Sequence, residues 1–186
     1  VFLDEDAAFH LDYMRLKIKP FVTPDNYYPI INNGLNKIAK LLNLKIKIAA
    51  HPRSNYETKP IKFKFPIEKN NTFDLIRDAE VVMGHSSTAL QYAILLKKPI
   101  ILVTTDEIQK AYYAKHWKQL IHSLAITLGK KVINLDHISD QNNFQDCLKV
   151  DHKKYELYVE NFIKSKGSSE KKLWDIVIEH MEKDFH

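Results

Sequence analysis

The chain has 186 residues, 45% of them hydrophobic, which suffices for one sizeable core and predicts a single domain over residues 1–186. A single cysteine, Cys147, excludes a disulfide framework and a multi-cysteine zinc site, and it is typical of a reducing cytoplasm. The net charge of +5 favours anionic partners, and no apolar run reaches the roughly 20 residues that span a bilayer.

Strand patterns and helix patterns alternate along the chain, which predicts a parallel sheet with helical crossovers. The expected strands are short apolar runs at Val1–Asp4, Leu44–Ala50, Ile61–Phe65, Glu80–Gly84, Pro99–Thr104 and Lys131–Leu135. The third run lies between Pro60 and Pro66 and alternates apolar residues with lysines, as an edge strand does. Because a strand already begins at Val1, we expect the chain to be the downstream part of a longer protein.

Helices are expected where apolar residues recur at helical spacing after a capping residue. They are predicted at Tyr28–Leu42, 71–79, Thr88–Leu96, Asp106–Leu128, His152–Lys164 and Glu170–Lys183. Pro20, Pro24 and Pro29 mark turns around the start of the first helix, and Gly129 ends the fourth. Right-handed crossovers then give an α/β, Rossmann-like doubly wound parallel sheet of about six strands in the order 3-2-1-4-5-6, closed by two C-terminal helices.

Ligands of an open parallel sheet bind beyond the carboxyl ends of its strands, where the strand order reverses. Polar residues follow four of the predicted strands: Asp4, Glu5 and Asp6; His51, Pro52 and Arg53; His85, Ser86, Ser87 and Thr88; and Thr104, Thr105, Asp106 and Glu107. A hydroxyl-rich turn that opens a helix offers backbone N–H groups, side-chain donors and the positive end of the helix dipole. Capping needs only one hydroxyl, so Ser86, Ser87 and Thr88 together predict a phosphate site.

The other polar residues have more than one interpretation. His51 is expected to donate a hydrogen bond to a nucleotide phosphate, because the following proline stiffens its turn. His85 either lines the site or supports the turn. The three acids after the first strand belong to the substrate region, cap a turn or hold Arg53, and one of them could act as a general base. Asp106 and Glu107 either begin a helix or hold sugar hydroxyls.

Two further catalytic arrangements are not expected. His116 and His122 are six residues apart on one predicted helix and do not share a face, so no metal site is predicted. Ser87 lacks the glycine-flanked elbow of a hydrolase nucleophile.

A set of short motifs resembles the C-terminal, donor-binding half of GT-B fold glycosyltransferases. The set consists of His51-Pro52, the segment 78–88 with its Ser86-Ser87-Thr88 turn, Lys98-Pro99 and the segment 104–107. The likeness is to bacterial surface-carbohydrate and capsule enzymes, among them sialyltransferases and polysialyltransferases, whose His-Pro and Ser-Ser/Thr motifs hold the nucleotide. Their acidic motif ends in glycine, whereas Asp4-Glu5-Asp6 is followed by Ala7.

The resemblance implies a metal-independent glycosyltransferase without cofactor that uses a CMP- or UDP-linked sugar, with His51 catalytic. It implies that Pro52, Arg53, His85, Ser86, Ser87 and Thr88 complete the nucleotide site. Its further partners would be a glycan or lipid-linked acceptor and an N-terminal domain of the same protein, without which the chain is expected to be inactive. The expected location is the cytoplasm, with peripheral contact to the inner membrane and no nucleic acid bound.

Two alternatives stay open at this point. One is another enzyme on the same scaffold, either a nucleotide-sugar epimerase or a glycerophosphotransferase of the CDP-glycerol type. The other is a non-enzymatic module that binds anions or nucleic acid through its lysines.

Overall fold

The computed structural model describes residues 1–139 and 144–184 and shows a Rossmann-like, doubly wound α/β fold. Within these residues, six parallel strands form one sheet in the order β3-β2-β1-β4-β5-β6. The strands are β1 (Phe2–Leu3), β2 (Ile48–Ala49), β3 (Ile67–Glu68), β4 (Val82–Gly84), β5 (Ile100–Thr104) and β6 (Val132–Asn134). The fold class and the strand order predicted from the sequence are both confirmed.

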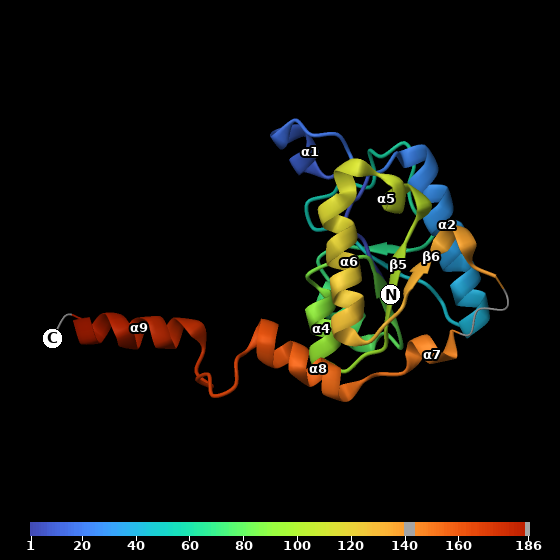
Figure 1. The fold of residues 1–186 in the computed structure, drawn as a ribbon. Helices are drawn as coiled ribbons and strands as arrows, with labels where there is room; N and C mark the ends of the chain where they lie inside the picture. The colour runs from blue at the N-terminus through green and yellow to red at the C-terminus, as the bar shows by residue number, and fades with distance from the viewer. Residues whose placement is uncertain (140–143, 185–186) are drawn as a thin grey trace.

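Helices cover both faces of the sheet (Figure 1). The α-helices are α1 (Leu11–Leu16), α2 (Pro24–Leu42), α3 (Thr72–Asp78), α4 (Leu90–Leu95), α5 (Asp106–Lys110), α6 (Lys115–Leu128), α7 (Gln145–Leu148), α8 (His152–Tyr158) and α9 (Leu173–Asp184). Shorter turns are the 3-10 helices η1 (Tyr112–Ala114) and η2 (Leu135–His137) and the π-helix η3 (Val159–Ile163). In Figure 1, α1 and α5 lie at one end of α6, and α4 and α8 lie at the other.

The strands bury both of their faces. Successive side chains of a strand point to opposite sides, so Phe2 packs into one hydrophobic cluster and Leu3 into another. The first cluster contains the apolar face of α2, and the second contains those of α3 and α4. This alternation explains why the central strands read as nearly continuous apolar runs in the sequence.

The position predicted for the edge strand is wrong. The segment Ile61–Phe65 forms no strand, and β3 lies just beyond it at Ile67–Glu68. The side chain of Phe63 is needed in the core, where its ring packs against Phe2 at a centroid distance of 5.9 Å. Pro66 adjoins the ladder through its carbonyl, which accepts from the Ile48 N–H at 2.8 Å. Proline lacks a donor but keeps its acceptor, so it can border a strand.

Two further predictions about the helices need correction. Pro24 is the first residue of α2, and Pro29 lies inside that helix instead of marking a turn. Pro29 is in the second turn and exposed, so its ring costs a single hydrogen bond near the helix start. The helix predicted over 106–128 is broken, because Ala111 is extended between α5 and η1. Gly129 ends α6 in the left-handed conformation, as predicted.

The two C-terminal helices behave differently. Tyr155 of α8 is buried in the second cluster, so α8 closes that face of the sheet. By contrast, α9 projects away from the body of the molecule (Figure 1), and its Trp174 is exposed. The prediction of two closing helices therefore holds for one of them. Within the described ranges, no helix is long and apolar enough to cross a bilayer.

Candidate functional site

The predicted polar residues come together at the carboxyl edge of the sheet. The strand order reverses between β1 and β4, so the loops that follow these two strands flank the switch point. These loops carry Glu5 and Ser86. His51 follows β2, on the other side of β1, at a distance of about 10 Å from β4 if strands keep their usual spacing. Thr104 ends β5, next to β4.

Three donors converge on one carboxylate at the switch point. The backbone N–H of Ser86 donates to Oε1 of Glu5 at 2.7 Å, and the Ser86 hydroxyl donates to Oε2 at 3.2 Å. Nε1 of Trp117, on α6, lies 3.3 Å from the same Oε2 and 2.8 Å from the Ser86 hydroxyl oxygen. Glu5 is half-buried and Trp117 buried. The chain thus surrounds its own carboxylate with donors at the switch point.

The hydroxyl turn does not open the helix in the way we predicted. Helix α4 begins at Leu90 and has only six residues, so its dipole offers little to an anion at Ser86. The Ser87 hydroxyl accepts from the Ala89 N–H at 3.3 Å, and Thr88 is exposed. The donors at this turn are therefore those of Ser86 and Trp117 and not those of a helix terminus.

His85 holds the turn in place through hydrogen bonds to the core. Its side chain is fully buried, and Nδ1 lies 2.8 Å from the Val103 carbonyl oxygen, so Nδ1 carries the proton that is donated. Nε2 then accepts from the Tyr27 hydroxyl at 2.9 Å. Burial lowers the pKa of His85, which keeps the ring neutral. With both ring nitrogens engaged, His85 fixes the backbone that presents Ser86 and does not itself reach a ligand.

The other two acids after β1 are buried in a polar network. Asp4 accepts from the Tyr56 hydroxyl and from the Asp6 N–H, the latter at 3.0 Å. Asp6 accepts from the Ser54 hydroxyl at 2.6 Å and pairs with Lys59 at 2.5 Å. Burial raises the pKa of Asp4 to about 6, opposed by the hydrogen bond from Tyr56. This network ties the loop after β1 to the loop after β2.

His51 is positioned by the same network. Its backbone N–H donates to the Tyr56 hydroxyl at 2.8 Å, and its ring lies against that of His10 at a centroid distance of 4.8 Å. Nδ1 of His51 is buried and has no hydrogen-bond partner among the residues that the structure describes. Burial, followed by the neighbouring charge of His10, lowers the pKa of His51. The ring is therefore neutral at pH 7, and because Nδ1 is buried, only Nε2 is left to meet a ligand.

Arg53 lies exposed beside the His51 ring, after the exposed Pro52. Its guanidinium donates to both carboxylate oxygens of Asp12 at 3.4 Å and lies 3.3 Å from Nε2 of His10. The three acids after β1 do not hold Arg53 through any contact in the described part of the chain, so this sequence-based alternative is wrong. Arg53 adds a cation at the edge of the site.

The acids after β5 are occupied by protein contacts. Asp106 accepts from Asn134 at 2.7 Å and contacts His137 at 2.9 Å, and hydrogen bonding, led by that from Lys110, lowers its pKa to about 2. Glu107 accepts from the N–H and the hydroxyl of Thr23, both at 2.8 Å. Glu107 therefore holds the start of α2 through Oε1 and links that helix to α5, while its Oε2 is buried and has no hydrogen-bond partner among the described residues.

Sequence reasoning missed Trp117, Tyr56 and Lys59. Trp117 follows the unpredicted helix break, and Tyr56 and Lys59 lie in a loop with no regular pattern, so no local signal points to them. In the part of the chain that the structure describes, no group of three or more His, Cys, Asp or Glu side chains could hold a metal ion. A cavity of about 470 Å³ opens at the opposite, amino edge of the sheet, near Val1 and Lys47, and contains none of the predicted site residues.

Comparisons of this chain with protein-family models, with curated proteins and with solved structures found no match. The function must therefore be argued from the geometry of the carboxyl edge.

Proposed function

We propose that this chain binds the nucleotide of an activated sugar at the carboxyl edge of its sheet, as the donor-binding half of a metal-independent glycosyltransferase for bacterial surface polysaccharide. The observation that carries the proposal is the convergence of the Ser86 N–H, the Ser86 hydroxyl and the Trp117 indole N–H on one anionic group. A phosphate offers the same charge and the same acceptor oxygens as the Glu5 carboxylate that now lies there.

In this proposal, the nucleotide phosphate displaces the Glu5 carboxylate and accepts the donors of Ser86 and Trp117. These donors are fixed before binding, because His85 and Tyr27 hold the turn from the core. Fixed donors stabilise the negative charge that grows on the leaving nucleotide, which lowers the barrier to transfer.

His51 contributes from the other side of β1. Its neutral ring can donate one hydrogen bond, and the loop after β2 that carries it lies at the same edge of the sheet as Ser86, so it can contact a second part of the same ligand. Arg53 adds positive charge beside it.

Calorimetric titration with CMP, CDP, UMP, UDP and GDP, without added metal, tests the proposal. We expect selective binding of one nucleotide, about 10- to 150-fold weaker in Ser86→Ala because one hydrogen bond to a charged group is lost. Ser123→Ala makes the same chemical change on the exposed face of α6 and is expected to bind like wild type. Binding that is equal in wild type and Ser86→Ala contradicts the assignment.

The related enzymes share this nucleotide site and differ in the product. A transferase needs an acceptor for turnover, an epimerase does not, and a glycerophosphotransferase releases CMP from CDP-glycerol. Product analysis with and without acceptor, on the protein that includes the acceptor-binding domain, separates the three.

A further inference from the structure

An exposed surface of alternating apolar and basic residues borders the candidate site. We name it the rim surface, and it consists of Met14, Arg15, Leu16, Lys17, Ile18, Lys19, Tyr112, Tyr113 and Lys115. Its first six residues come from α1 and the segment after it, and its last three come from η1 and the start of α6. Both segments follow the carboxyl ends of strands, so they belong to the same end of the molecule.

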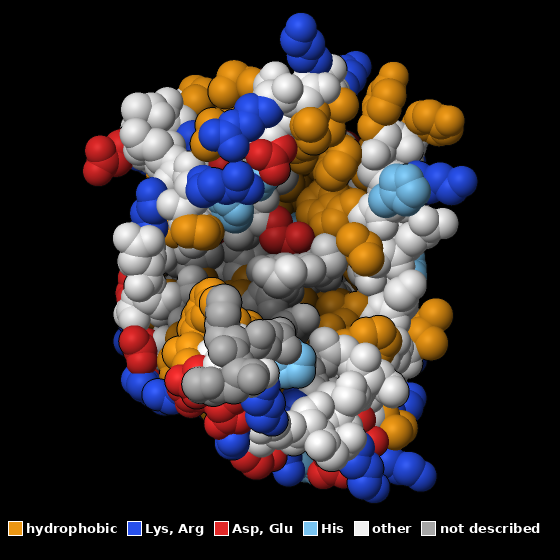
Figure 2. Space-filling view, turned by 90° about the vertical axis from the view of Figure 1, so that its left-hand side faces the viewer, with side chains coloured by type: hydrophobic (Ala, Val, Ile, Leu, Met, Phe, Trp, Pro, Cys, Tyr) orange, Lys and Arg blue, Asp and Glu red, His pale blue; other side chains and the backbone are white. Residues whose placement is uncertain are grey.

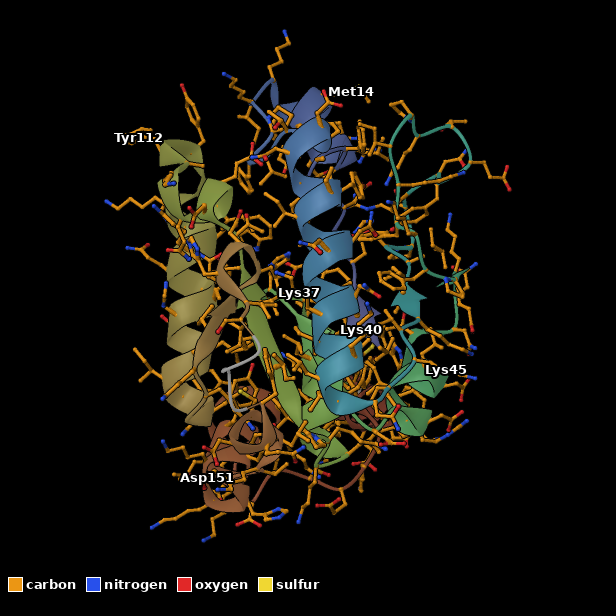
Figure 3. The ribbon with its side chains drawn as sticks, turned by 90° about the vertical axis from the view of Figure 1, so that its right-hand side faces the viewer. Met14, Lys37, Lys40, Lys45, Tyr112 and Asp151 are labelled. Carbon is orange, nitrogen blue, oxygen red and sulfur yellow. The ribbon has the colours of Figure 1, made fainter. Side chains whose placement is uncertain are left out.

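The two parts of the rim surface lie at the same end of the molecule. Figure 3 shows Met14 and Tyr112 at the same end of the molecule, away from Lys40, Lys45 and Asp151. A chain of aromatic contacts joins them beneath the surface: Tyr13 of α1 packs against Phe21 at 5.3 Å, and Phe21 packs against Trp117 of α6 at 5.7 Å. Trp117 is also a donor of the candidate site, so the rim surface adjoins that site directly.

The apolar side chains of the rim surface are largely exposed to solvent. The exposed fractions are 74% for Met14, 66% for Leu16, 44% for Ile18, 83% for Tyr112 and 63% for Tyr113. Figure 2 shows that hydrophobic and basic side chains intermingle at this upper end of the molecule, above a hollow with hydrophobic walls. Clustered exposed apolar side chains of this kind mark an interaction surface.

The charges of the rim surface indicate an anionic partner. Residues 13–19 carry three cations and no acid, and residues 110–118 likewise carry three lysines and no acid. Within the described ranges, no ion pair involves Arg15, Lys17 or Lys19. These cations are therefore free to pair with an external anion.

We propose that the rim surface docks this domain on an anionic phospholipid bilayer, with the mouth of the candidate site turned toward the lipid. Met14, Leu16 and Ile18 are aliphatic, so they gain from hydrocarbon contact and cannot stack on nucleobases, which only Tyr112 and Tyr113 of this surface could do. Each is followed by a cation, whereas the centre of a protein–protein interface is depleted of lysine. Tyrosine and lysine side chains, which this surface also carries, are enriched at the level of the lipid headgroups in membrane interfaces.

This docking gives the domain a way to meet a lipid-linked acceptor, a step that rests on the proposed function. The docking itself does not, because it can be measured without nucleotide. Vesicle binding and nucleotide binding can therefore fail separately.

Co-sedimentation with sucrose-loaded vesicles tests the docking. We expect the protein to bind vesicles that contain phosphatidylglycerol and not vesicles of phosphatidylcholine alone. The triple variant R15Q/K17Q/K19Q is expected to lower the partition coefficient about 100-fold, at roughly fivefold per cation. The control K40Q/K45Q/K153Q removes the same charge from exposed lysines outside the rim surface and is expected to lose no more than a few-fold.

A second variant separates hydrocarbon contact from charge. M14S/L16S/I18S leaves the net charge unchanged and is expected to lower the partition coefficient at least about tenfold. These side chains are exposed, so a matched thermal unfolding curve checks that the variant is folded. Three results would each overturn the proposal: no binding to the acidic vesicles, an equal loss in the control, or tighter binding to a single-stranded oligonucleotide with the vesicle partition unaffected by M14S/L16S/I18S.

Discussion

Replacing Glu5 with glutamine should tighten nucleotide binding if the carboxylate lies in the place of a phosphate. The change keeps the size of the side chain and removes its charge, so the donors of Ser86 and Trp117 become available to the ligand. Two unit charges about 5 Å apart repel by about 1 kcal/mol in bulk water and by about 3 kcal/mol at an effective dielectric constant of 20. Glu5 is half-buried and lies between these limits. The expected gain in affinity is therefore about 5- to 150-fold.

Calorimetric titration of the two proteins with the preferred nucleotide measures this gain. It should shrink as the salt concentration rises, because the repulsion is screened. Glu160→Gln makes the same change at an exposed position on η3 and should leave the affinity unaltered. If Glu5→Gln binds as weakly as wild type, or more weakly, the carboxylate does not compete with the phosphate and the reasoning is refuted.

Three changes to the scaffold have expected effects on the free energy of unfolding. Tyr27→Phe removes the donor to Nε2 of buried His85 and should cost about 1–3 kcal/mol in urea unfolding; a cost near zero would show that this hydrogen bond is not needed. The raised pKa of Asp4 means that the folded chain keeps this proton between about pH 4 and pH 6, where the unfolded chain has lost it, so stability should fall by about 3 kcal/mol as the pH rises through that window. Asp4→Asn should remove this fall, and an unchanged pH profile would contradict the assignment. In Gly34→Ala the new Cβ would lie 2.8 Å from Cβ of Leu135, so thermal unfolding should show a loss of about 1–3 kcal/mol, and wild-type stability would mean that η2 shifts freely.

The sheet could be predicted because its central strands are buried on both faces and therefore appear as short apolar runs between helices. The edge strand could not, because Ile61, Phe63 and Phe65 alternate with lysines as a strand does, while Phe63 is recruited to the core instead. The helix break at Ala111 has no glycine or proline to announce it, and α1 is too short to show a periodic pattern.

The position of the site followed from topology, since parallel strands present their carboxyl ends at one edge. Its internal contacts did not. The pairing of Glu5 with Ser86 joins residues 81 positions apart, and Trp117 reaches Ser86 from a helix 31 positions further along the chain. Such contacts depend on side-chain packing across elements, which local sequence patterns do not encode. The same limit applies to His85, whose full burial gives it a supporting role.

The most direct test of the central claim is to follow the backbone N–H of Ser86 and the indole N–H of Trp117 by NMR while the nucleotide is added. Trp174, exposed on α9, supplies an internal control of the same kind. If the nucleotide phosphate takes the place of the Glu5 carboxylate, the Ser86 and Trp117 signals move in saturable fashion, with the affinity found by calorimetry, while the Trp174 signal stays unchanged. Nucleotide binding that leaves Ser86 and Trp117 unmoved, or that shifts residues of the cavity at the amino edge instead, would contradict that claim.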